Sequence, residues 1–150
     1  MLTKRVGYLL AVEDSEEDFD TITDAAKRVC LPNEIRRVTS GEDCLQYLED
    51  RARNLLTLPI LILLDLNTPK GDGREALRAI TGNDRLRGIP LVVLSASGNA
   101  RDVGFCYKHG ANAYHLKPVS HPAHLQILQI IFSYWLTNTV LSVPESDDRV

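Results

Sequence analysis

Apolar runs that resemble β-strands alternate with segments of helical periodicity along most of this chain. Two of the runs, 58–66 (LPILILLDL) and 90–96 (PLVVLSA), are apolar at nearly every position. A strand with one face in water alternates apolar and polar residues, so continuous runs predict strands that are covered on both faces, as in the centre of a parallel sheet. Because parallel strands need helical crossovers, this pattern restricts the chain to a layered α/β fold.

The rest of the chain completes a series of strand and helix pairs. The predicted strands cover 6–12, 34–40, 58–66, 90–96 and 111–116, and the predicted helices cover 16–29, 41–52, 74–80, 100–110 and 122–137. This alternation predicts a doubly wound parallel sheet of the flavodoxin-like (βα)5 type, with strand order 2-1-3-4-5 and an extended last helix. In that order the winding reverses between the first and third strands, so a ligand crevice is expected there.

Most of the predicted strands end beside a residue with a reactive side chain. Glu13 and Asp14 follow the first strand, Asp65 ends the apolar part of the third, Ser95 that of the fourth, and Lys117 follows the fifth. The carboxyl ends of parallel strands lie along one edge of the sheet, so these side chains should converge. The expected site therefore combines carboxylates with a hydroxyl group and an amine.

Carboxylates crowded into a crevice repel one another, and a divalent cation would neutralise them. Mg²⁺ prefers oxygen ligands and is usually bound by one or two carboxylates together with phosphate oxygens. The Lys117 ammonium and the Ser95 hydroxyl suit the remaining charge of a phosphoryl group. Asp65 stands alone at its strand end and is the candidate nucleophile, which would form an aspartyl phosphate. These residues predict phosphoryl chemistry that depends on Mg²⁺.

Composition limits the number of domains and the class of partner. The chain has 150 residues, 44% apolar and 25% charged, which fits one folded domain, expected at 1–141, and a polar tail at 142–150. The net charge of -3 and the lack of a basic run argue against a nucleic-acid surface. No apolar run approaches the length of a membrane span or a signal-peptide core, and the cysteines lack disulfide or zinc spacing. We therefore expect a cytoplasmic protein that does not bind membranes.

Several short motifs occur in a fixed order along the chain. They are the acidic pair Glu13-Asp14, the segment LLDLNTPKGDG with Pro69 and Gly73 at set distances from Asp65, Ser95 followed by Ala96, and Lys117-Pro118. In this combination the chain resembles the receiver domains of two-component response regulators, over residues 6–137. The resemblance implies a protein that is not an enzyme in the usual sense, but a phosphoacceptor that catalyses its own phosphorylation and dephosphorylation.

The resemblance implies a role for each residue near the nucleophile. Asp65 would accept the phosphoryl group from the phosphohistidine of a sensor histidine kinase. Asp14, the Asp65 carboxylate and the backbone carbonyl of Asn67 would bind Mg²⁺ directly. Glu13 would act through a water molecule; it stands where the family more often has Asp. Gly71 replaces a bulkier residue of the family, so the loop after the nucleophile should be looser.

The same resemblance implies a switch. Lys117 would pair with the phosphoryl oxygens, and Ser95 would hydrogen-bond the phosphoryl group and draw its loop inward. Tyr114, three residues before the lysine, would turn between an outward and a buried position. This rearrangement would alter the face formed by the fourth helix, fifth strand and fifth helix. The expected output is a changed binding preference. The protein would act either as a diffusible effector itself or as an intermediate in a phosphorelay to a histidine phosphotransfer protein.

Features outside these motifs suggest a narrower resemblance. LDLNTPKGDGREAL, Trp135 in the last helix and a following VPE are similar to the small regulators encoded with bacterial and cyanobacterial phytochromes, the Rcp type. This implies a kinase that senses red light. The receiver sequence itself does not encode the stimulus, the output partner or the phosphoryl lifetime.

The last predicted helix is apolar around more of its circumference than contact with a sheet requires. Its apolar residues include Leu125, Ile127, Leu128, Ile130, Ile131, Phe132, Tyr134, Trp135 and Leu136. The excess predicts a protein interface, which we expect to be a homodimer through this helix and its neighbouring strand and helix, with kinase docking as the alternative. His121 and His124, at the start of the helix, are expected at the surface.

Two other functions compete with an active receiver. A degenerate receiver would bind its partners constitutively, but none of the required groups is missing here. A phosphatase of the haloacid dehalogenase type also uses an Asp nucleophile, Mg²⁺, a hydroxyl group and a lysine at strand ends. That family has a second Asp two residues after the nucleophile, where this chain has Asn67, and its acidic pair comes late. Turnover of generic phosphate esters is therefore not expected.

Overall fold

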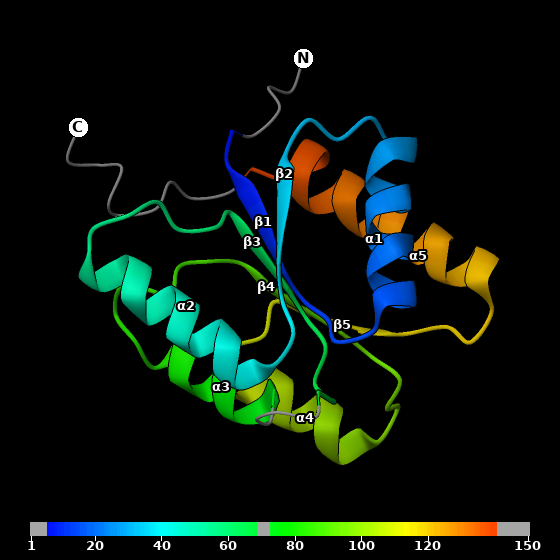
Figure 1. The fold of residues 1–150 in the computed structure, drawn as a ribbon. Coiled ribbons are helices and arrows are strands. Elements are labelled where there is room, and N and C mark those ends of the chain that lie inside the picture. The colour runs from blue at the N-terminus through cyan, green and yellow to red at the C-terminus, as the bar shows by residue number, and fades with distance from the viewer. Residues whose placement is uncertain (1–5, 69–72, 141–150) are drawn as a thin grey trace.

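The computed structural model describes residues 6–68 and 73–140. Parallel strands form one sheet in the order β2-β1-β3-β4-β5 (Figure 1). The strands are β1 (Tyr8–Val12), β2 (Glu34–Val38), β3 (Leu61–Leu64), β4 (Leu91–Ser95) and β5 (Ala113–Leu116). The helices are α1 (Glu16–Arg28), α2 (Gly41–Arg53), α3 (Gly73–Thr81), α4 (Ala100–Lys108) and α5 (His121–Ser133), followed by the π-helical η1 (Tyr134–Asn138). The predicted flavodoxin-like fold and strand order are confirmed.

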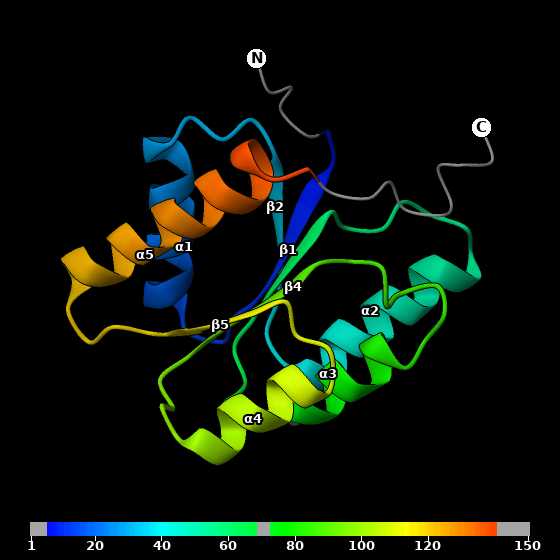
Figure 2. The ribbon, with the colours of Figure 1, turned by 180° about the vertical axis from the view of Figure 1, so that it is seen from behind.

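Helices cover both faces of the sheet. Figures 1 and 2 show α1 and α5 on one face and α2, α3 and α4 on the other. Side chains along a strand point alternately to the two faces. Leu9 and Leu63 therefore pack with the cluster under α1 and α5, whereas Leu10 and Leu64 pack with the cluster under the other three helices. Burial on both sides explains why β1 and β3 are apolar throughout and why β4 is apolar up to Ser95.

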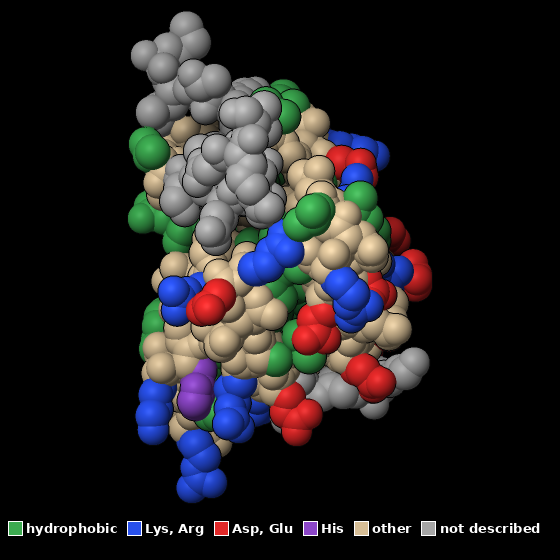
Figure 3. Space-filling model, turned by 90° about the vertical axis from the view of Figure 1, so that its left-hand side faces the viewer, with side chains coloured by type: hydrophobic (Ala, Val, Ile, Leu, Met, Phe, Trp, Pro, Cys, Tyr) green, Lys and Arg blue, Asp and Glu red, His purple; other side chains and the backbone are tan. Residues whose placement is uncertain are grey.

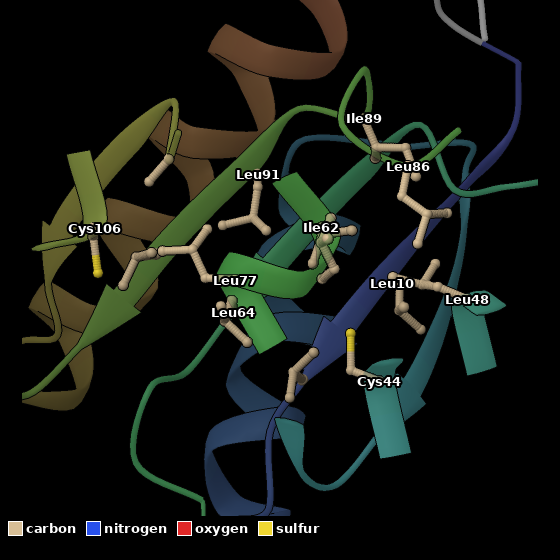
Figure 4. Packing of buried hydrophobic residues seen from close by; sticks show 14 of the residues in the cluster. Leu10, Cys44, Leu48, Ile62, Leu64, Leu77, Leu86, Ile89, Leu91 and Cys106 are labelled. Atoms are coloured by element: carbon tan, nitrogen blue, oxygen red, sulfur yellow. The ribbon is translucent and has the colours of Figure 1, made fainter. Parts of the chain in front are cut away.

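The core beneath α2, α3 and α4 joins every helix of that layer to the sheet (Figure 4). Leu48 from α2, Leu77 from α3 and Cys106 from α4 are fully buried there. They belong to the same cluster as Ile62 of β3 and Leu91 of β4. Because protein cores are packed as densely as organic crystals, this cluster fixes where the strands end and holds the residues that follow them.

Polar side chains begin several of the helices. Ser15 is the N-cap of α1, and its hydroxyl accepts a hydrogen bond from the backbone N–H of Asp18 at 3.2 Å. Ser40, Asn99 and Ser120 cap α2, α4 and α5 in the same way. Each cap satisfies a backbone donor that the helix leaves unpaired. The cap at Ser15 places the first turn of α1 directly after the end of β1.

The last helix has the expected extent, but its final turns are of the π type. Helical structure runs from His121 to the end of η1 at Asn138, close to the predicted 122–137. In η1 the side chain of Leu136 is buried against the sheet layer, whereas Tyr134 is 54% exposed. The prediction of an extended last helix is confirmed, and part of its apolar surface does face solvent.

The fifth strand, β5, is an outer strand of the sheet, and the backbone groups on its two sides have different partners. Toward β4, the backbone N–H of Lys117 donates to the carbonyl of Ser95 at 2.7 Å. The backbone N–H of Tyr114 instead donates to the hydroxyl of Tyr107, from α4, at 3.0 Å. A side chain from the preceding helix therefore occupies a backbone donor of this edge strand.

Some predictions concern residues outside the described part of the chain. Pro69 and Gly71 lie within 69–72, and the predicted boundary between domain and tail lies within 141–150. Among the described residues, none of the helices combines the length and the apolar character that crossing a membrane requires. On the face in Figure 3, acidic and basic side chains are both present over the described surface. The expected absence of nucleic-acid binding stays a prediction.

Candidate functional site

The register of the sheet brings the predicted strand-end residues together. Val12 at the end of β1 pairs with Leu64 at the end of β3, so the chain leaves these neighbouring strands at the same level. The backbone N–H of Asp65 donates to the carbonyl of Val12 at 3.1 Å. Glu13 therefore lies beside Asp65, at the point between the first and third strands where the crevice was predicted.

An acidic cluster occupies this point. Carboxylate oxygens of Glu13, Asp14 and Asp65 lie within 4.8 Å of one another. Glu13 and Asp65 are buried, at 3% and 7% exposure, whereas Asp14 is open to solvent. Hard oxygen ligands around an accessible position suit Mg²⁺ or a similar divalent cation, which keeps several of its waters. The residues present therefore fit a metal ion of this class.

Lys117 reaches into the cluster from the loop after β5. Its ammonium lies 3.0 Å from Glu13 Oε1 and 3.2 Å from Asp65 Oδ2. It also lies 2.9 Å from Asp18 Oδ2, in the first turn of α1. Burial by itself lowers the pKa of Lys117, but the charges of Asp65 and Glu13 and the hydrogen bond to Asp18 outweigh it and raise the pKa above its ordinary value. The ammonium is therefore firmly charged.

Glu13 is held differently from the exposed acids. Burial raises its pKa to about 7, although the Lys117 ammonium acts in the opposite direction. Its backbone carbonyl accepts a hydrogen bond from Arg37 Nε, in β2, at 2.8 Å. A cation entering the cluster would favour the ionised carboxylate.

Asn67 and Ser95 line the other side of Asp65. The backbone N–H of Asn67 donates to Asp65 Oδ1 at 3.0 Å, and its side-chain amide donates to the Ser95 hydroxyl at 3.3 Å. Ser95 is fully buried at the end of β4. The hydroxyl of Ser95 also accepts the backbone N–H of Ser97 at 3.2 Å. Asn67 therefore links the nucleophile to the predicted switch serine, because it donates hydrogen bonds to both.

Gly73, at the start of α3, packs tightly beneath the nucleophile. A Cβ atom at this position would lie 2.7 Å from Leu66 Cα and 3.0 Å from the Asp65 carbonyl oxygen. Its backbone N–H donates to the Leu66 carbonyl at 3.2 Å. Because only glycine permits this approach, the glycine named among the sequence motifs has a steric reason.

The predicted switch tyrosine contacts the loop that carries Ser95. Tyr114 is partly buried, and its hydroxyl donates to the backbone carbonyl of Ser97 at 2.6 Å. The Ser97 hydroxyl in turn donates to Asp102 Oδ2, in α4, at 2.7 Å. Asp102 also pairs with Arg74, in α3, at 2.7 Å. The loop after β4 is therefore tied to α3, α4 and β5 together.

Sequence reasoning missed three of these contributors. Asp18, Arg74 and Asp102 each lie in the first turn of a helix, beside the carboxyl edge of the sheet. The signal that could have found them is this position, since the first turns of the helices in a doubly wound fold face the same edge as the strand ends. Acidic residues there commonly stabilise the helix alone, and this alternative hid the contacts that Asp18 and Asp102 make with the site.

The prediction for the histidines of α5 was half wrong. His121 is exposed, as expected, but His124 is only 4% exposed and lies between α5 and α1. Its Nδ1 lies 4.0 Å from Asp18 Oδ1, and its buried Nε2 has no hydrogen-bond partner. The helix is apolar on nearly all sides, so periodicity could not identify the buried side of its first turn.

We expect His124 to make the fold less stable in mild acid. Burial lowers the pKa of His124. The charge of Asp18 acts in the opposite direction, whereas Lys117 and His121 lower the pKa further. The unfolded chain, with a pKa of about 6.5, therefore takes up the proton first, and stability falls as the pH drops below that value. In urea titrations from pH 7.5 to 5.5, His124→Gln should lose less unfolding free energy than wild type. His121→Gln is the matched control, and equal slopes for all three proteins would contradict the expectation.

Comparison with known proteins places the chain among regulators. Residues 9–129 match the response regulator receiver domain family. The chain is 35% identical over 134 residues to the response regulator Rcp1 of Synechocystis sp., covering 89% of this chain and 91% of Rcp1. It is also 35% identical over 128 residues to the probable methanogenesis regulatory protein FilR2 of Methanothrix harundinacea, covering 85% of this chain and 83% of that protein.

Solved structures agree with this match. The crystal structure of the phosphorylated cyanobacterial phytochrome response regulator RcpA has a TM-score of 0.86 at 35% identity, covering 93% of this chain and all of RcpA. The Mn²⁺-bound form of Rcp1 has a TM-score of 0.85 at 34% identity, covering 91% and 99% of the two chains. The relative Rcp1 thus binds a divalent metal ion. In the present chain, the acidic cluster of Glu13, Asp14 and Asp65 is a candidate site for such an ion. By sequence and fold, the chain belongs to the response regulator receiver domain family.

Proposed function

We propose that Asp65 accepts a phosphoryl group from the phosphohistidine of a sensor histidine kinase. The observation that carries this proposal is the setting of the Asp65 carboxylate. One oxygen faces the Lys117 ammonium at 3.2 Å, the other accepts the Asn67 N–H at 3.0 Å, and Glu13 and Asp14 complete an acidic cluster beside it. A nucleophile, a cation for the phosphoryl oxygens and ligands for a metal ion are therefore adjacent.

The reaction asks little covalent chemistry of the protein. An Asp65 oxygen attacks phosphorus, the P–N bond to the kinase histidine breaks, and the histidine ring keeps the electron pair and takes up a proton from water. Lys117 hydrogen-bonds the phosphoryl oxygens and offsets their charge. Mg²⁺, held by Asp14, Asp65 and the Asn67 carbonyl, with Glu13 through water, would supply further neutralisation of that charge.

The signal would leave the site through Ser95 and Tyr114. A phosphoryl group on Asp65 offers a new partner to the Ser95 hydroxyl, which now bonds Asn67 and the Ser97 backbone. Movement of this loop would also move the Ser97 carbonyl that Tyr114 binds. The result would be a different surface at α4, β5 and α5 for the output partner. With this surface the protein would act as a diffusible effector, or as an intermediate in a phosphorelay to a histidine phosphotransfer protein.

The partner kinase we propose is a phytochrome that senses red light. RcpA is a phytochrome response regulator, and the bacteriophytochrome response regulator RtBRR is 36% identical to this chain. Both likenesses support a kinase of the same class. We propose that the protein works in the cytoplasm, where the kinase domain of such a receptor would meet it.

Metal binding is the direct test of the site. Asp14→Asn should weaken Mg²⁺ binding, measured by calorimetry, at least about tenfold, because it removes an anionic ligand from the cluster. Asp20→Asn changes the same residue type at an exposed position of α1 and should leave the affinity unchanged. Equal affinities for wild type and Asp14→Asn would argue against this metal site.

We also propose that the protein forms a homodimer through α5 with β5 and α4. Ile130 and Tyr134 of the last helix are 53% and 54% exposed, and Leu116 of β5 is 56% exposed. Several large apolar side chains left exposed to water favour a protein interface. Sedimentation should show a dimer at tens of micromolar that Ile130→Asp dissociates and Leu56→Asp, an exposed position after α2, does not. A monomeric wild type would refute the dimer.

A further inference from the structure

One ammonium group serves three carboxylates in this site, and one of the three has no place in the proposed metal centre. Lys117 Nζ lies closest to Asp18 Oδ2, at 2.9 Å, compared with 3.0 Å to Glu13 and 3.2 Å to Asp65. Asp18 comes from α1 and lies outside the acidic cluster. Its side chain is 30% exposed, whereas that of Lys117 is 12% exposed. Solvent therefore screens the Asp18 end of this ion pair more than the Lys117 end.

The three contacts use every hydrogen that the ammonium can donate. A phosphoryl group on Asp65 needs some of these hydrogens. A metal ion would offer Glu13 and Asp65 a new positive partner, but it would not relieve Asp18. Asp18 is then the carboxylate that still competes with the phosphoryl group for Lys117, and its negative charge also disfavours a second anion nearby.

A released Asp18 would not lack a partner. Its other oxygen, Oδ1, lies 4.0 Å from Nδ1 of the buried His124, and that ring has a second nitrogen without a hydrogen-bond partner. A neutral histidine with its hydrogen on Nδ1 can donate to the carboxylate after a small shift. The carboxylate thus stands between two donors, Lys117 in the site and His124 in the contact between α1 and α5.

We propose that Asp18 is a positioning residue that competes with the phosphoryl group for Lys117 and turns to His124 when the phosphoryl group prevails. The proposal rests on the phosphoacceptor function proposed above. Asp18 then affects how favourable the phosphorylated state is. Its movement toward His124 also changes the contact between α1 and α5 when the site is phosphorylated. The geometry assigns this role to a residue that is neither the nucleophile nor a metal ligand.

The test measures binding of beryllofluoride, which imitates a phosphoryl group on aspartate, in saturating Mg²⁺ by calorimetry. Asp18→Asn keeps the shape of the side chain and removes its charge, so it should bind beryllofluoride about fivefold more tightly than wild type. Asp18→Glu, which restores the carboxylate, should return toward the wild-type affinity. Asp20→Asn, on the exposed side of the same helix, should match wild type. Circular dichroism checks that each variant is folded.

A second background identifies the route of the effect. In Lys117→Arg, whose guanidinium holds its hydrogens in a different, planar arrangement, the gain from Asp18→Asn should shrink, because the competition is for the ammonium of lysine. An undiminished gain would mean simple repulsion between Asp18 and the anion and would overturn the proposal. In wild type, the ¹⁵N resonances of His124 should shift on addition of beryllofluoride, and Asp18→Asn should remove most of that shift.

The possible failures are distinguishable. If wild type binds no beryllofluoride and forms no adduct with phosphoryl donors, the phosphoacceptor function fails, and the role of Asp18 fails with it. If wild type binds beryllofluoride and Asp18→Asn binds it equally or more weakly, the function stands and the role of Asp18 is overturned. A His124 resonance that does not respond in wild type would overturn the second half of the proposal alone.

Discussion

Asp65→Asn is expected to abolish the covalent phosphoryl adduct that the wild-type protein forms with acetyl phosphate and Mg²⁺. A carboxylate oxygen carries the charge that attacks phosphorus, and a neutral amide of the same shape does not, so adduct formation should fall by at least about 100-fold. The measurement is the intact mass of both proteins after incubation, with and without Mg²⁺. The wild-type adduct should be stable in acid and labile in base, as an acyl phosphate is.

The matched control for this experiment is Asp84→Asn. The Asp84 side chain is 89% exposed and lies in the loop after α3, so this variant should form the adduct at the wild-type level. Equal adduct formation by Asp65→Asn and wild type would refute Asp65 as the acceptor. A folded wild type that gives no adduct would favour the constitutive binding module, and phosphotransfer from a histidine kinase would then decide between that module and a receiver that rejects small donors.

The largest loss of stability is expected from Phe132→Ala. The ring of Phe132 is fully buried in the cluster that joins α1, α5 and the sheet. Removing it forfeits the transfer free energy of a large side chain and leaves a cavity that dense neighbours fill only in part, which costs about 3–5 kcal/mol. Urea unfolding, followed by circular dichroism at one protein concentration, measures the difference.

Val119→Ala provides the comparison. Val119 precedes α5 and is fully exposed, so its truncation should change the unfolding free energy by less than about 0.5 kcal/mol. A loss below about 1 kcal/mol for Phe132→Ala would mean that the cluster collapses around the missing ring. It would also mean that the packing of Phe132 contributes little to holding α5 on the sheet.

Much of the fold follows from the sequence because the central strands are buried on both faces. The runs at 58–66 and 90–96 can only be strands of a covered sheet, and the order of the remaining elements then has few solutions. The fifth strand and the last helix were harder. Residues 113–115 are only partly buried and Leu116 is exposed. In the π turns of η1, Leu136 reaches the core while Tyr134 does not. Such choices are made by packing and leave little local signal.

The candidate site divides in the same way. Residues directly after strands, such as Asp65 and Lys117, could be predicted to converge, because parallel strands end along one edge. Asp18 and Asp102 could be placed near this edge by their first-turn positions, but their individual contacts could not be predicted, since these depend on where a capped helix begins and how it leans on the sheet. His124 was misplaced because a helix that is apolar all round gives periodicity no side to choose.

The bond between Tyr107 and β5 limits how this edge of the sheet can associate with another chain. An outer strand with open backbone donors invites pairing with another chain, and exposed edges of this kind promote ribbon-like association. In this protein the phenol of Tyr107 already occupies the Tyr114 N–H. A second molecule could extend the sheet here only by displacing that side chain. Association at this side is thereby directed toward side-chain packing, which can end in a closed pair, and away from an open-ended stack of sheets.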